Sequence, residues 1–467
     1  MNAKPSDSDE VDSSHPYPKK EFFDVTDRWF DINCVFCEEK FKEESELMLH
    51  LLAHEDFKRD LTLDEVSEIL STTIKEDYTN KLITFISYLL TFTAEDQINL
   101  IFSGKSSAGK SYLPIEIAKY FPEESVITYA GASATSFFHD RGDFDKEKHI
   151  ITIDLSRKIL LFLDQPHYTL LEKLRPMLSH DLKKLTYKIT DRNMKAGLRT
   201  KTVELIGYPT VVFCSAKLTL DEQEKTRCIM LSPESSQEKL NKSLELIARM
   251  LADKLNFIKT LRSDSKRRFL KLRIKALSEC NIPRVIIRDT ENILEQFKGD
   301  RKYLLARHQR DFPRLLSLIK GMALLNFFNR EKDPVTKTIY ANDEDVEQGL
   351  KLYEEIAQSN ELGIQPEALD IYLKIILPSY VNNEGISRKE IGRLYWEEYH
   401  EHISDWKLRD QLIPSLESSG LIYLDQDPND KRKFLVYPNY SPKKATIDQT
   451  YTEEGKGLQL ENEVVKT

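Results

Sequence analysis

The sequence predicts a multidomain mixed α/β protein, and three observations lead to that class. The chain has 467 residues, which is room for two to four domains at roughly 100–200 residues each. Between residues 98 and 214, short apolar runs alternate with helical stretches, a pattern typical of parallel strands joined by crossover helices. On either side of this region, apolar residues recur at three- and four-residue steps, which predicts helices.

Composition and charge exclude several classes of protein. The 68 Lys and Arg residues against 77 Asp and Glu residues give a net charge of −9, which excludes a globally basic nucleic-acid coat but not local basic elements. Hydrophobic residues make up 40% of the chain, as expected of a folded protein. The apolar run at 321–328 is too short to cross a membrane, and the first residues lack the apolar core of a secretory signal. Five cysteines do not make a disulfide scaffold, so we expect an intracellular protein with no membrane partner.

A zinc finger is expected at residues 28–57, after a polar tail at 1–27. Two cysteines and two histidines have the spacing C-x2-C-x12-H-x3-H, and Phe41 and Leu47 occupy the two apolar positions of that pattern. The cysteines on a hairpin turn and the histidines one turn apart on a helix would form a tetrahedral Zn²⁺ site. Metal binding would supply folding energy that so small a module lacks. The expected ligands are Cys34, Cys37, His50 and His54.

The surface of this finger predicts its role. Its helix carries Glu43, Glu44 and Glu46, which repel phosphate. We therefore expect a structural or protein-contact role, with a replication or regulatory protein as a possible partner, and not reading of the DNA major groove. A helical linker is expected next, at 58–94, with Thr62 and Glu65 as a capping box.

The first residues of the α/β region carry a phosphate-binding signature. Residues 104–111, Gly-Lys-Ser-Ser-Ala-Gly-Lys-Ser, match GxxxxGK[ST] between a predicted strand and a predicted helix. The two glycines let successive N–H groups point at phosphate oxygens, Lys110 would reach the β- and γ-phosphates, and the Ser111 hydroxyl would ligate Mg²⁺. The alternative is a serine-rich turn that merely resembles the motif. The residues assigned to ATP are Gly104, Lys105, Ser106, Ser107, Ala108, Gly109, Lys110, Ser111 and Tyr112.

A carboxylate follows a second apolar strand at the distance that a P-loop ATPase needs. The run 159–163 ends in Asp164, which suits the acid that organises Mg²⁺. The next residue is Gln165, which can orient a water molecule but cannot accept its proton. Hydrolysis is therefore expected to be slow unless another carboxylate such as Glu172 serves. The alternative reading of Asp164 is a turn residue at a strand end.

A basic β-hairpin is predicted at residues 184–203. Thr, Tyr and Ile alternate along its two arms, and its Gly-containing tip is polar. Residues 184–201 hold six basic side chains and one acidic one, so the ribbon could follow a phosphate backbone. The alternative is a solvated lysine-rich hairpin. The candidate DNA contacts are Lys188, Arg192, Lys195 and Arg199.

Three further features complete a recognisable order. A buried strand at 210–214 leads to the polar Ser215, Arg227 stands before another apolar strand, and the helical region that follows contains Arg310 and Arg314. A P-loop, an acidic strand end, a basic hairpin, a polar strand end, an arginine and a helical lid follow one another along the chain. In this order residues 95–360 resemble an AAA+ ATPase. Within that group, the hairpin before the Ser215 strand is similar to that of the minichromosome-maintenance helicases and of related plasmid and virus replication helicases.

The resemblance implies roles for individual residues. Lys110 and Ser111 would be Walker A, and Asp164 would be Walker B. Ser215 would be sensor 1 and Arg227 the arginine finger presented to a neighbouring subunit, while Arg314, or second to it Arg310, would be sensor 2. The sequence departs from the family at Gln165, where a glutamate is usual, at Ser215, where asparagine is more common, and in having a short finger-bearing segment in place of a large N-terminal collar. The resemblance implies a core at 95–235 and a lid at 236–362.

The C-terminal unit, expected at 363–440, resembles a winged helix. Ser387 and Glu390 predict the start of one helix, a second helix is expected at 404–418 with a bend at Pro414, and a hairpin with a basic far arm follows. The second helix would approach the major groove, and the wing residues Lys431, Arg432 and Lys433 would contact phosphates. The alternative is a winged helix that contacts protein. A polar tail is expected at 441–467.

These expectations combine into one functional hypothesis. The chain is predicted to be an ATP-dependent, DNA-acting AAA+ ATPase that forms a hexamer-type ring, a replicative helicase or replication initiator in the cytoplasm and associated with the nucleoid. Its cofactors would be ATP, Mg²⁺ and Zn²⁺. The main alternative is an ATP-binding, weakly hydrolysing DNA-binding regulator or loader, which Gln165 suggests. A remodeller of proteins is a third possibility.

Overall fold

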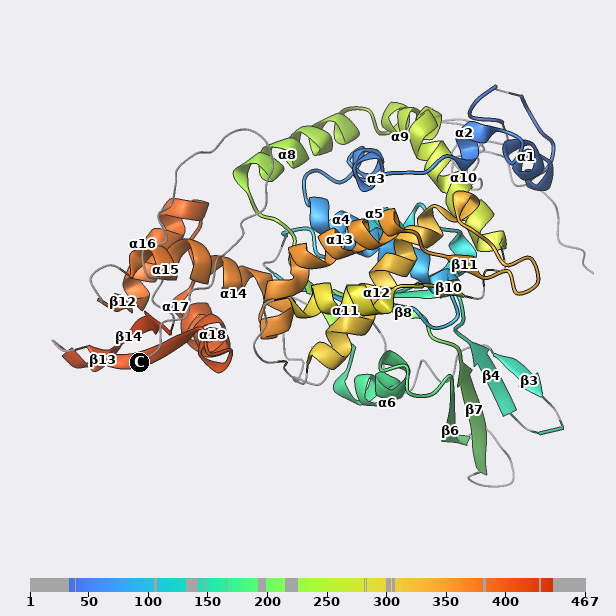
Figure 1. Cartoon of the computed structure of the whole chain (residues 1–467). Coiled ribbons are helices and arrows are strands. Elements are labelled where there is room, and N and C mark those ends of the chain that lie inside the picture. The colour runs from blue at the N-terminus through green and yellow to red at the C-terminus, as the bar shows by residue number, and fades with distance from the viewer. Residues whose placement is uncertain are drawn as a thin grey trace, which may run out of the picture.

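The computed structural model describes residues 33–37, 39–104, 107–131, 142–145, 147–148, 150–164, 166–191, 199–214, 226–280, 282, 284–299, 304, 307–380, 384–427 and 430–439. Figure 1 shows three regions: an α/β body in the centre, a small unit around α1 and α2 at one end, and a lobe from α14 to β14 at the other. The molecule is therefore a mixed α/β protein with several units, as the sequence predicts.

The helices of the described residues are α1 Glu44–Leu51, α2 Glu55–Lys58, α3 Leu63–Leu70, α4 Tyr78–Leu89, α5 Tyr112–Ala118, α6 Tyr168–Leu178, α8 Gln237–Ala252, α9 Lys254–Ser263, α10 Ser265–Glu279, α11 Thr290–Lys298, α12 His308–Leu325, α13 Asp343–Leu362, α14 Pro366–Ile371, α15 Leu377–Ser379, α16 Arg388–Tyr399, α17 Asp405–Lys407 and α18 Ile413–Ser418. The strands are β1 Asn99–Phe102, β2 Val126–Tyr129, β3 Asp143–Asp145, β4 Ile150–Asp154, β5 Ile159–Phe162, β6 Lys184–Asp191, β7 Arg199–Ile206, β8 Thr210–Cys214, β9 Cys228–Leu231, β10 Val285–Ile286, β11 Ile339–Tyr340, β12 Ile386–Ser387, β13 Ile422–Asp427 and β14 Asp430–Pro438.

A parallel sheet forms the centre of the body. In the described part of the chain it has five strands in the order β2-β5-β8-β1-β9, and every pairing is parallel. Successive residues of β1 and β5 face opposite sides: Leu100 and Phe102 join one hydrophobic core, whereas Ile101 joins the other. Such double-sided burial explains why these strands are continuous apolar runs in the sequence.

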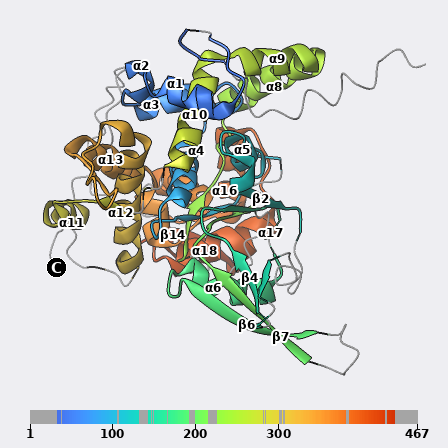
Figure 2. The same ribbon diagram turned by 90° about the vertical axis from the view of Figure 1, so that its right-hand side faces the viewer.

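A second sheet carries the basic hairpin. Its order is β3-β4-β7-β6, with β6 and β7 antiparallel over their whole length and β4 parallel to β7. Its inner face packs on α6, where the Tyr187 hydroxyl donates to the Lys173 carbonyl oxygen. The apolar run at 150–153 is a strand, but it belongs to this sheet and not to the central one. Figure 2 shows the β6–β7 ribbon extending away from the body.

The helices before and after the sheet pack together on one of its faces. The capping box predicted at Thr62 and Glu65 is present: each side chain accepts the other residue's backbone N–H. α12 packs against α4 and α13, and Gly321 of α12 allows a close approach, because a Cβ there would meet Ile86 of α4 at 2.3 Å. The helical region also contains the short parallel pair β10–β11, which the sequence did not predict.

Three asparagine side-chain amides bond to the backbone as a neighbouring peptide group would: each accepts from a backbone N–H and donates to a backbone carbonyl oxygen. The Asn360 side chain accepts from the Met230 N–H and donates to the Met230 carbonyl oxygen, so it lies along the outer edge of β9. Asn326 does the same to Leu61, at 2.8 and 3.1 Å. Asn99 accepts from the Val211 N–H and donates to the Leu178 carbonyl oxygen. All three side chains are buried, so these bonds satisfy backbone groups that lack a strand or helix partner.

The C-terminal lobe has its own hydrophobic core. It contains α14 to α18 and a three-stranded antiparallel sheet in the order β12-β14-β13, counted over the described residues. Ser387 begins α16 and accepts the Glu390 N–H at 3.2 Å. The helix predicted at 404–418 is continuous but contains a π-helical segment, Leu408–Leu412, just before Pro414. Proline cannot donate to a carbonyl four residues back and would clash with it, so the wider turn accommodates Pro414. A π-helical segment at Tyr372–Ile376 precedes Pro378 in the same way.

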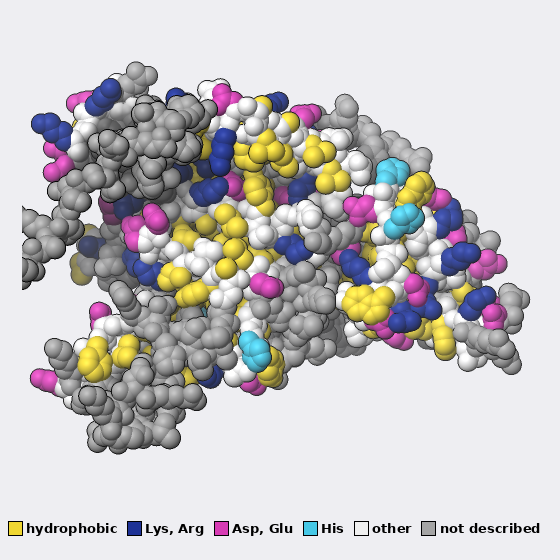
Figure 3. All heavy atoms as spheres, turned by 180° about the vertical axis from the view of Figure 1, so that it is seen from behind, with side chains coloured by type: hydrophobic (Ala, Val, Ile, Leu, Met, Phe, Trp, Pro, Cys, Tyr) yellow, Lys and Arg dark blue, Asp and Glu magenta, His cyan; other side chains and the backbone are white. Residues whose placement is uncertain are grey.

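Helix α8 presents an apolar stripe to solvent. No residue of α8 is buried, and Figure 3 shows apolar side chains gathered along the upper margin of the molecule, where this helix runs. The stripe repeats at three- and four-residue steps and contains Leu240, Leu244, Ile247 and Leu251. Among the helices of the described residues, none combines the length and the apolar character that spanning a membrane requires.

Candidate metal centre and nucleotide site

The two cysteines and two histidines of the finger converge on one point. Their ligand atoms all lie within 4.8 Å of one another. The Cys34 Sγ is 3.5 Å from the His54 Nε2, the Cys37 Sγ is 3.2 Å from the His50 Nε2, and the two Nε2 atoms are 3.0 Å apart. Zinc–sulfur bonds of about 2.3 Å and zinc–nitrogen bonds of about 2.0 Å give tetrahedron edges of roughly 3.3–3.8 Å. The four residues therefore fit a zinc ion.

Neighbouring groups hold these ligands in place. Asn33 and Lys40 form a β-bridge, and the Phe36 N–H donates to the Cys34 Sγ. The Glu39 carboxylate lies 3.6 Å from the His50 Nδ1, where it can orient the imidazole toward the metal. His54 differs from the sequence expectation: α1 ends at Leu51, and His54 stands in the following turn, directly before α2.

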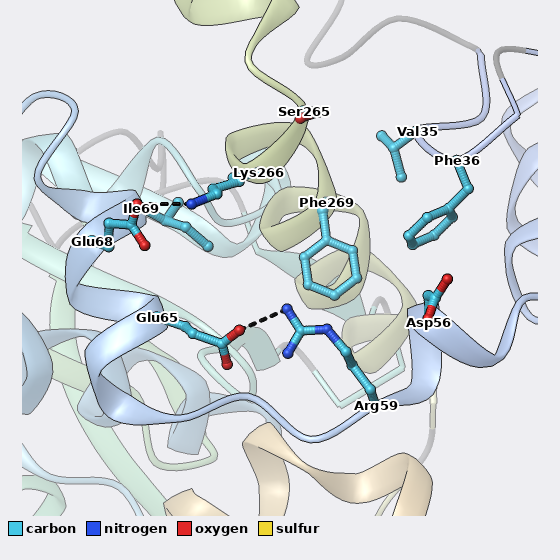
Figure 4. A pocket seen from close by; sticks show the side chains of 10 residues that line it. All are labelled: Val35, Phe36, Asp56, Arg59, Glu65, Glu68, Ile69, Ser265, Lys266 and Phe269. Carbon is cyan, nitrogen blue, oxygen red and sulfur yellow. Dashed lines mark hydrogen bonds and ion pairs between the residues drawn. The ribbon is translucent and has the colours of Figure 1, made fainter.

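The finger packs on the body through aromatic side chains. The Phe269 ring of α10 meets the Phe36 ring at 6.0 Å and the Phe57 ring at 5.8 Å, both edge to face. Figure 4 shows the cavity of about 260 Å³ beside this contact, where Arg59 points to Glu65 and Lys266 points to Glu68. The finger's apolar residues belong to the same core as α10 and α12. This contact agrees with the structural role that the acidic helix of the finger suggests.

Arg273 joins the finger region to two helices, and no local sequence signal marks it. Arg273 as a residue is 1% exposed, and its guanidinium donates to the carbonyl oxygens of Leu325, Phe57 and Arg59. Burial lowers the pKa of Arg273 to about 10. Three segments more than 50 positions apart in sequence thus meet at one side chain.

The phosphate-binding motif follows the carboxyl end of β1, an interior strand of the parallel sheet. Gly104 has φ 135° and Gly109 has φ 94°, conformations that favour glycine, so the loop needs both residues. The Lys110 ammonium donates to the Gly104 carbonyl oxygen at 3.0 Å, across the mouth of the loop. Ser111 stands directly before α5, and its side chain does not cap that helix. Lys105 and Ser106 lie outside the described residues.

The strand register brings the predicted acidic residue to the same edge of the sheet. Phe102 of β1 pairs with Cys214 of β8, and Phe162 of β5 pairs with Phe213. The three strands therefore end at the same edge of the sheet. Asp164 follows the last residue of β5 by two positions, and β8 lies between β5 and the P-loop strand β1. In open α/β sheets, ligands bind at this edge, near the strand where the order reverses. Gln165 and Ser215 lie outside the described residues.

Charges from the C-terminal lobe act on the P-loop lysine, which the sequence did not reveal. Burial is the main effect that lowers the pKa of Lys110. The positive charge of Lys407 lowers it further, while Glu367 raises it. Lys407 and Glu367 form an ion pair at 2.7 Å, with exposed side-chain fractions of 22% and 14%. The lobe therefore lies close to the nucleotide loop.

The predicted lid and finger arginines gather at the opposite edge of the sheet. Arg227 stands directly before β9, and its Nε donates to the Ser179 hydroxyl at 2.5 Å. The buried Arg314 donates to the Thr226 carbonyl oxygen at 2.6 Å and to Asp311 at 2.8 Å. Arg310 donates to the Thr226 hydroxyl. The structure thus brings Arg227, Arg310 and Arg314 together around Thr226.

The predicted DNA contacts are only partly described. Lys188 is exposed on β6, and Arg199 begins β7, although its side chain is outside the described part. Lys433 is exposed and paired with Asp430 at 3.0 Å. Arg192, Lys195 and the side chains of Lys431 and Arg432 also lie outside the described part.

Comparison with known proteins adds no assignment to these observations. No protein-family model matches the chain, and a search of curated proteins found no relative. The candidate sites therefore stand on their own geometry: a Cys₂His₂ group that fits zinc, and a glycine-rich loop at the carboxyl edge of a parallel sheet.

Proposed function

We propose that the chain is an ATP-dependent, DNA-acting ATPase of the AAA+ type, a replicative helicase or replication initiator that works as a ring. One observation carries the proposal: the GxxxxGK[ST] loop follows the carboxyl end of an interior parallel strand, and Lys110 donates to the Gly104 carbonyl oxygen. A triphosphate entering the loop would replace the Gly104 carbonyl oxygen as the partner of Lys110. Asp164 at the same edge supports Mg²⁺ binding.

The arginine edge supports a shared site between subunits. β1 and β9 are parallel and pair from Asn99 with Cys228 to Phe102 with Leu231. The loop follows the last residue of β1, whereas Arg227 precedes the first residue of β9. A strand of four residues separates the two edges by about 13 Å. Arg227 therefore lies about one strand length from its own P-loop, and a phosphate that it contacts would belong to another subunit, as a head-to-tail ring requires.

The ribbon supports a DNA substrate. β6 and β7 carry the basic side chains out from the body (Figure 2), and Lys188 is exposed on this ribbon. A row of cations on an extended ribbon can follow a phosphate backbone. ATP hydrolysis at the interface between two subunits would then move the β6–β7 ribbon together with the DNA strand bound to it.

The test is the ATPase rate with and without single-stranded DNA, on protein whose mass is determined by light scattering. Lys110→Ala should abolish nucleotide binding and turnover. Lys188→Ala together with Lys195→Ala should remove stimulation by DNA and strand displacement, while the basal rate stays unchanged. Lys184→Ala is the matched control, because Lys184 stands at the base of the same ribbon and is paired with Glu204. Unchanged DNA affinity and unwinding in the ribbon variant would contradict the DNA-motor proposal.

Gln165 favours the alternative of an ATP-binding regulator or loader that hydrolyses slowly. An amide cannot take the proton of the attacking water. This alternative predicts turnover near background in the unmodified protein and a sharp rise in Gln165→Glu. A fast unmodified enzyme that loses activity in Gln165→Glu would exclude it.

A further inference from the structure

A cavity of about 460 Å³ lies between the lid, the edge strand β9 and the C-terminal lobe. Thr226 and Met230 line it from the sheet edge, and Arg307 lines it from the start of α12. The opposite wall comes from the continuous helix formed by the π-helical segment η6 (Leu408–Leu412) and α18, with Gln411 and Ser415. From Thr226 to Met230 this cavity follows the outer strand β9, whereas the P-loop follows β1. None of the described P-loop residues lines it. It is therefore a separate site.

Arg307 is a buried cation with unused hydrogen-bonding capacity. Its side chain is only 10% exposed. Its Nε donates to the Asp311 carboxylate at 3.1 Å, but within the described part of the chain its Nη2 has no hydrogen-bond partner. Its Nη1 faces Gly363, because a Cβ at that glycine would lie 3.0 Å from it. A buried guanidinium normally has its donors satisfied by an anion or by carbonyl groups.

The charge around Arg307 is not balanced. Arg307 stands directly before α12, Arg310 and Arg314 lie in its first turns, and Asp311 accepts from Arg307 and Arg314. Burial is the main effect that lowers the pKa of Arg314; the charge of Asp311 raises this pKa, and the charge of Arg307 lowers it. Cations at the beginning of an 18-residue helix also oppose its dipole. One more negative charge would relieve both effects.

The other walls of the cavity suit an oxyanion. Hydroxyl and amide groups come from Thr226, Gln365, Gln411 and Ser415. The one carboxylate in the lining, Asp410, already accepts from the Arg409 guanidinium at 2.8 and 3.1 Å. Hydrogen-bond donors around a buried cation are what a tetrahedral oxyanion requires, and the volume exceeds that of a single phosphate group.

We propose that this cavity binds a phosphate group, with Arg307 as its anchor, and that the ligand joins the lid to the C-terminal lobe. The group would be bound by the free edge of the Arg307 guanidinium on one wall and by the polar groups of the η6–α18 helix on the other. Free inorganic phosphate and the phosphate of a nucleotide share this chemistry. A bound phosphate would link the C-terminal lobe to the body. Without phosphate, water would fill the cavity between them.

The test is calorimetric binding of inorganic phosphate to the full chain at constant ionic strength, with chloride as the balancing anion. Two variants report on the two walls: Arg307→Gln removes the charge, and Ser415→Val removes a hydroxyl from the lobe. Arg307→Gln should weaken phosphate binding between about tenfold and a hundredfold, the range for losing a charge-assisted hydrogen bond. Arg288→Gln, at an exposed pair with Glu331, is the matched control and should bind as the unmodified chain does.

The Lys110→Ala background separates this site from the P-loop. Phosphate binding that persists in Lys110→Ala and is lost in Lys110→Ala with Arg307→Gln supports the proposal, whatever the ATPase assays show. ADP binding that depends on Arg307 in the same background would identify a nucleotide as the source, and phosphate without ADP would identify the free ion. Hydrogen exchange gives a second readout: phosphate should slow exchange at residues 408–419. Equal phosphate affinity in Arg307→Gln and Arg288→Gln, or no phosphate binding by the unmodified chain, would overturn the proposal.

Discussion

Loss of one zinc ligand gives the sharpest test of the metal centre. Cys37 is the ligand to replace because it is exposed, whereas Cys34 is fully buried and its replacement would also disturb packing. Structural zinc contributes about 10–16 kcal/mol in finger peptides, so each of four ligands accounts for about 2.5–4 kcal/mol. Cys37→Ser should therefore weaken zinc binding between about a hundredfold and a thousandfold.

The assay is zinc content by mass spectrometry, followed by competition with a chromophoric chelator. The unmodified chain should bind one zinc ion, and Cys37→Ser should release it to the chelator. Glu39→Gln should have a smaller effect, about tenfold to a hundredfold, because Glu39 only orients His50. Cys280→Ser is the control, since Cys280 lies outside the Cys₂His₂ group. Equal zinc affinity in Cys37→Ser and Cys280→Ser would refute the assignment of these four residues as the ligands.

Two further predictions concern buried cations. Arg273→Met should lower the free energy of unfolding by about 3 kcal/mol or more, because three carbonyl oxygens lose their donor. Lys266→Met on the same helix, at an exposed pair, should cost no more than about 1 kcal/mol, and equal losses in the two chemical-denaturation curves would contradict the role of Arg273. Burial lowers the pKa of Lys271 to about 7, so between about pH 7 and 10 the unfolded chain binds a proton that the folded chain does not, and stability rises with pH. Near pH 7 the free energy of unfolding should be larger for Lys271→Met than for the unmodified chain, and this difference should be smaller at pH 9. A difference that does not change with pH would show that Lys271 titrates normally.

Local patterns predicted those features that depend on neighbouring residues. The spacing of Cys34 to His54 predicts a cluster that the structure brings together, and the capping box at Thr62 is also present. The apolar runs at β1, β5 and β8 are visible because strands buried on both faces need apolar residues at every position. Each of these signals is complete within a few residues of the chain.

Long-range pairing was outside the reach of the same reasoning. The runs at β4 and β5 look alike in the sequence and are close together, yet β4 pairs with β7 and β5 pairs with β8. Which partner each strand pairs with depends on which sheet has an unpaired edge strand. No local sequence pattern predicts this. Arg273 and Arg307 were missed for the same reason, since their partners and walls come from distant segments.

The amide of Asn360 has a mechanical consequence. It occupies both hydrogen-bonding groups of Met230 and so closes that position on the outer edge of β9 to any incoming strand. The end of α13 is thereby fastened to the sheet. The next residue with a left-handed backbone is Gly363, at φ 68°, between α13 and α14. If the C-terminal lobe rotates while the sheet stays intact, the backbone would change conformation at Gly363. The Asn360 amide, bonded to Met230, would keep the end of α13 in place during that rotation.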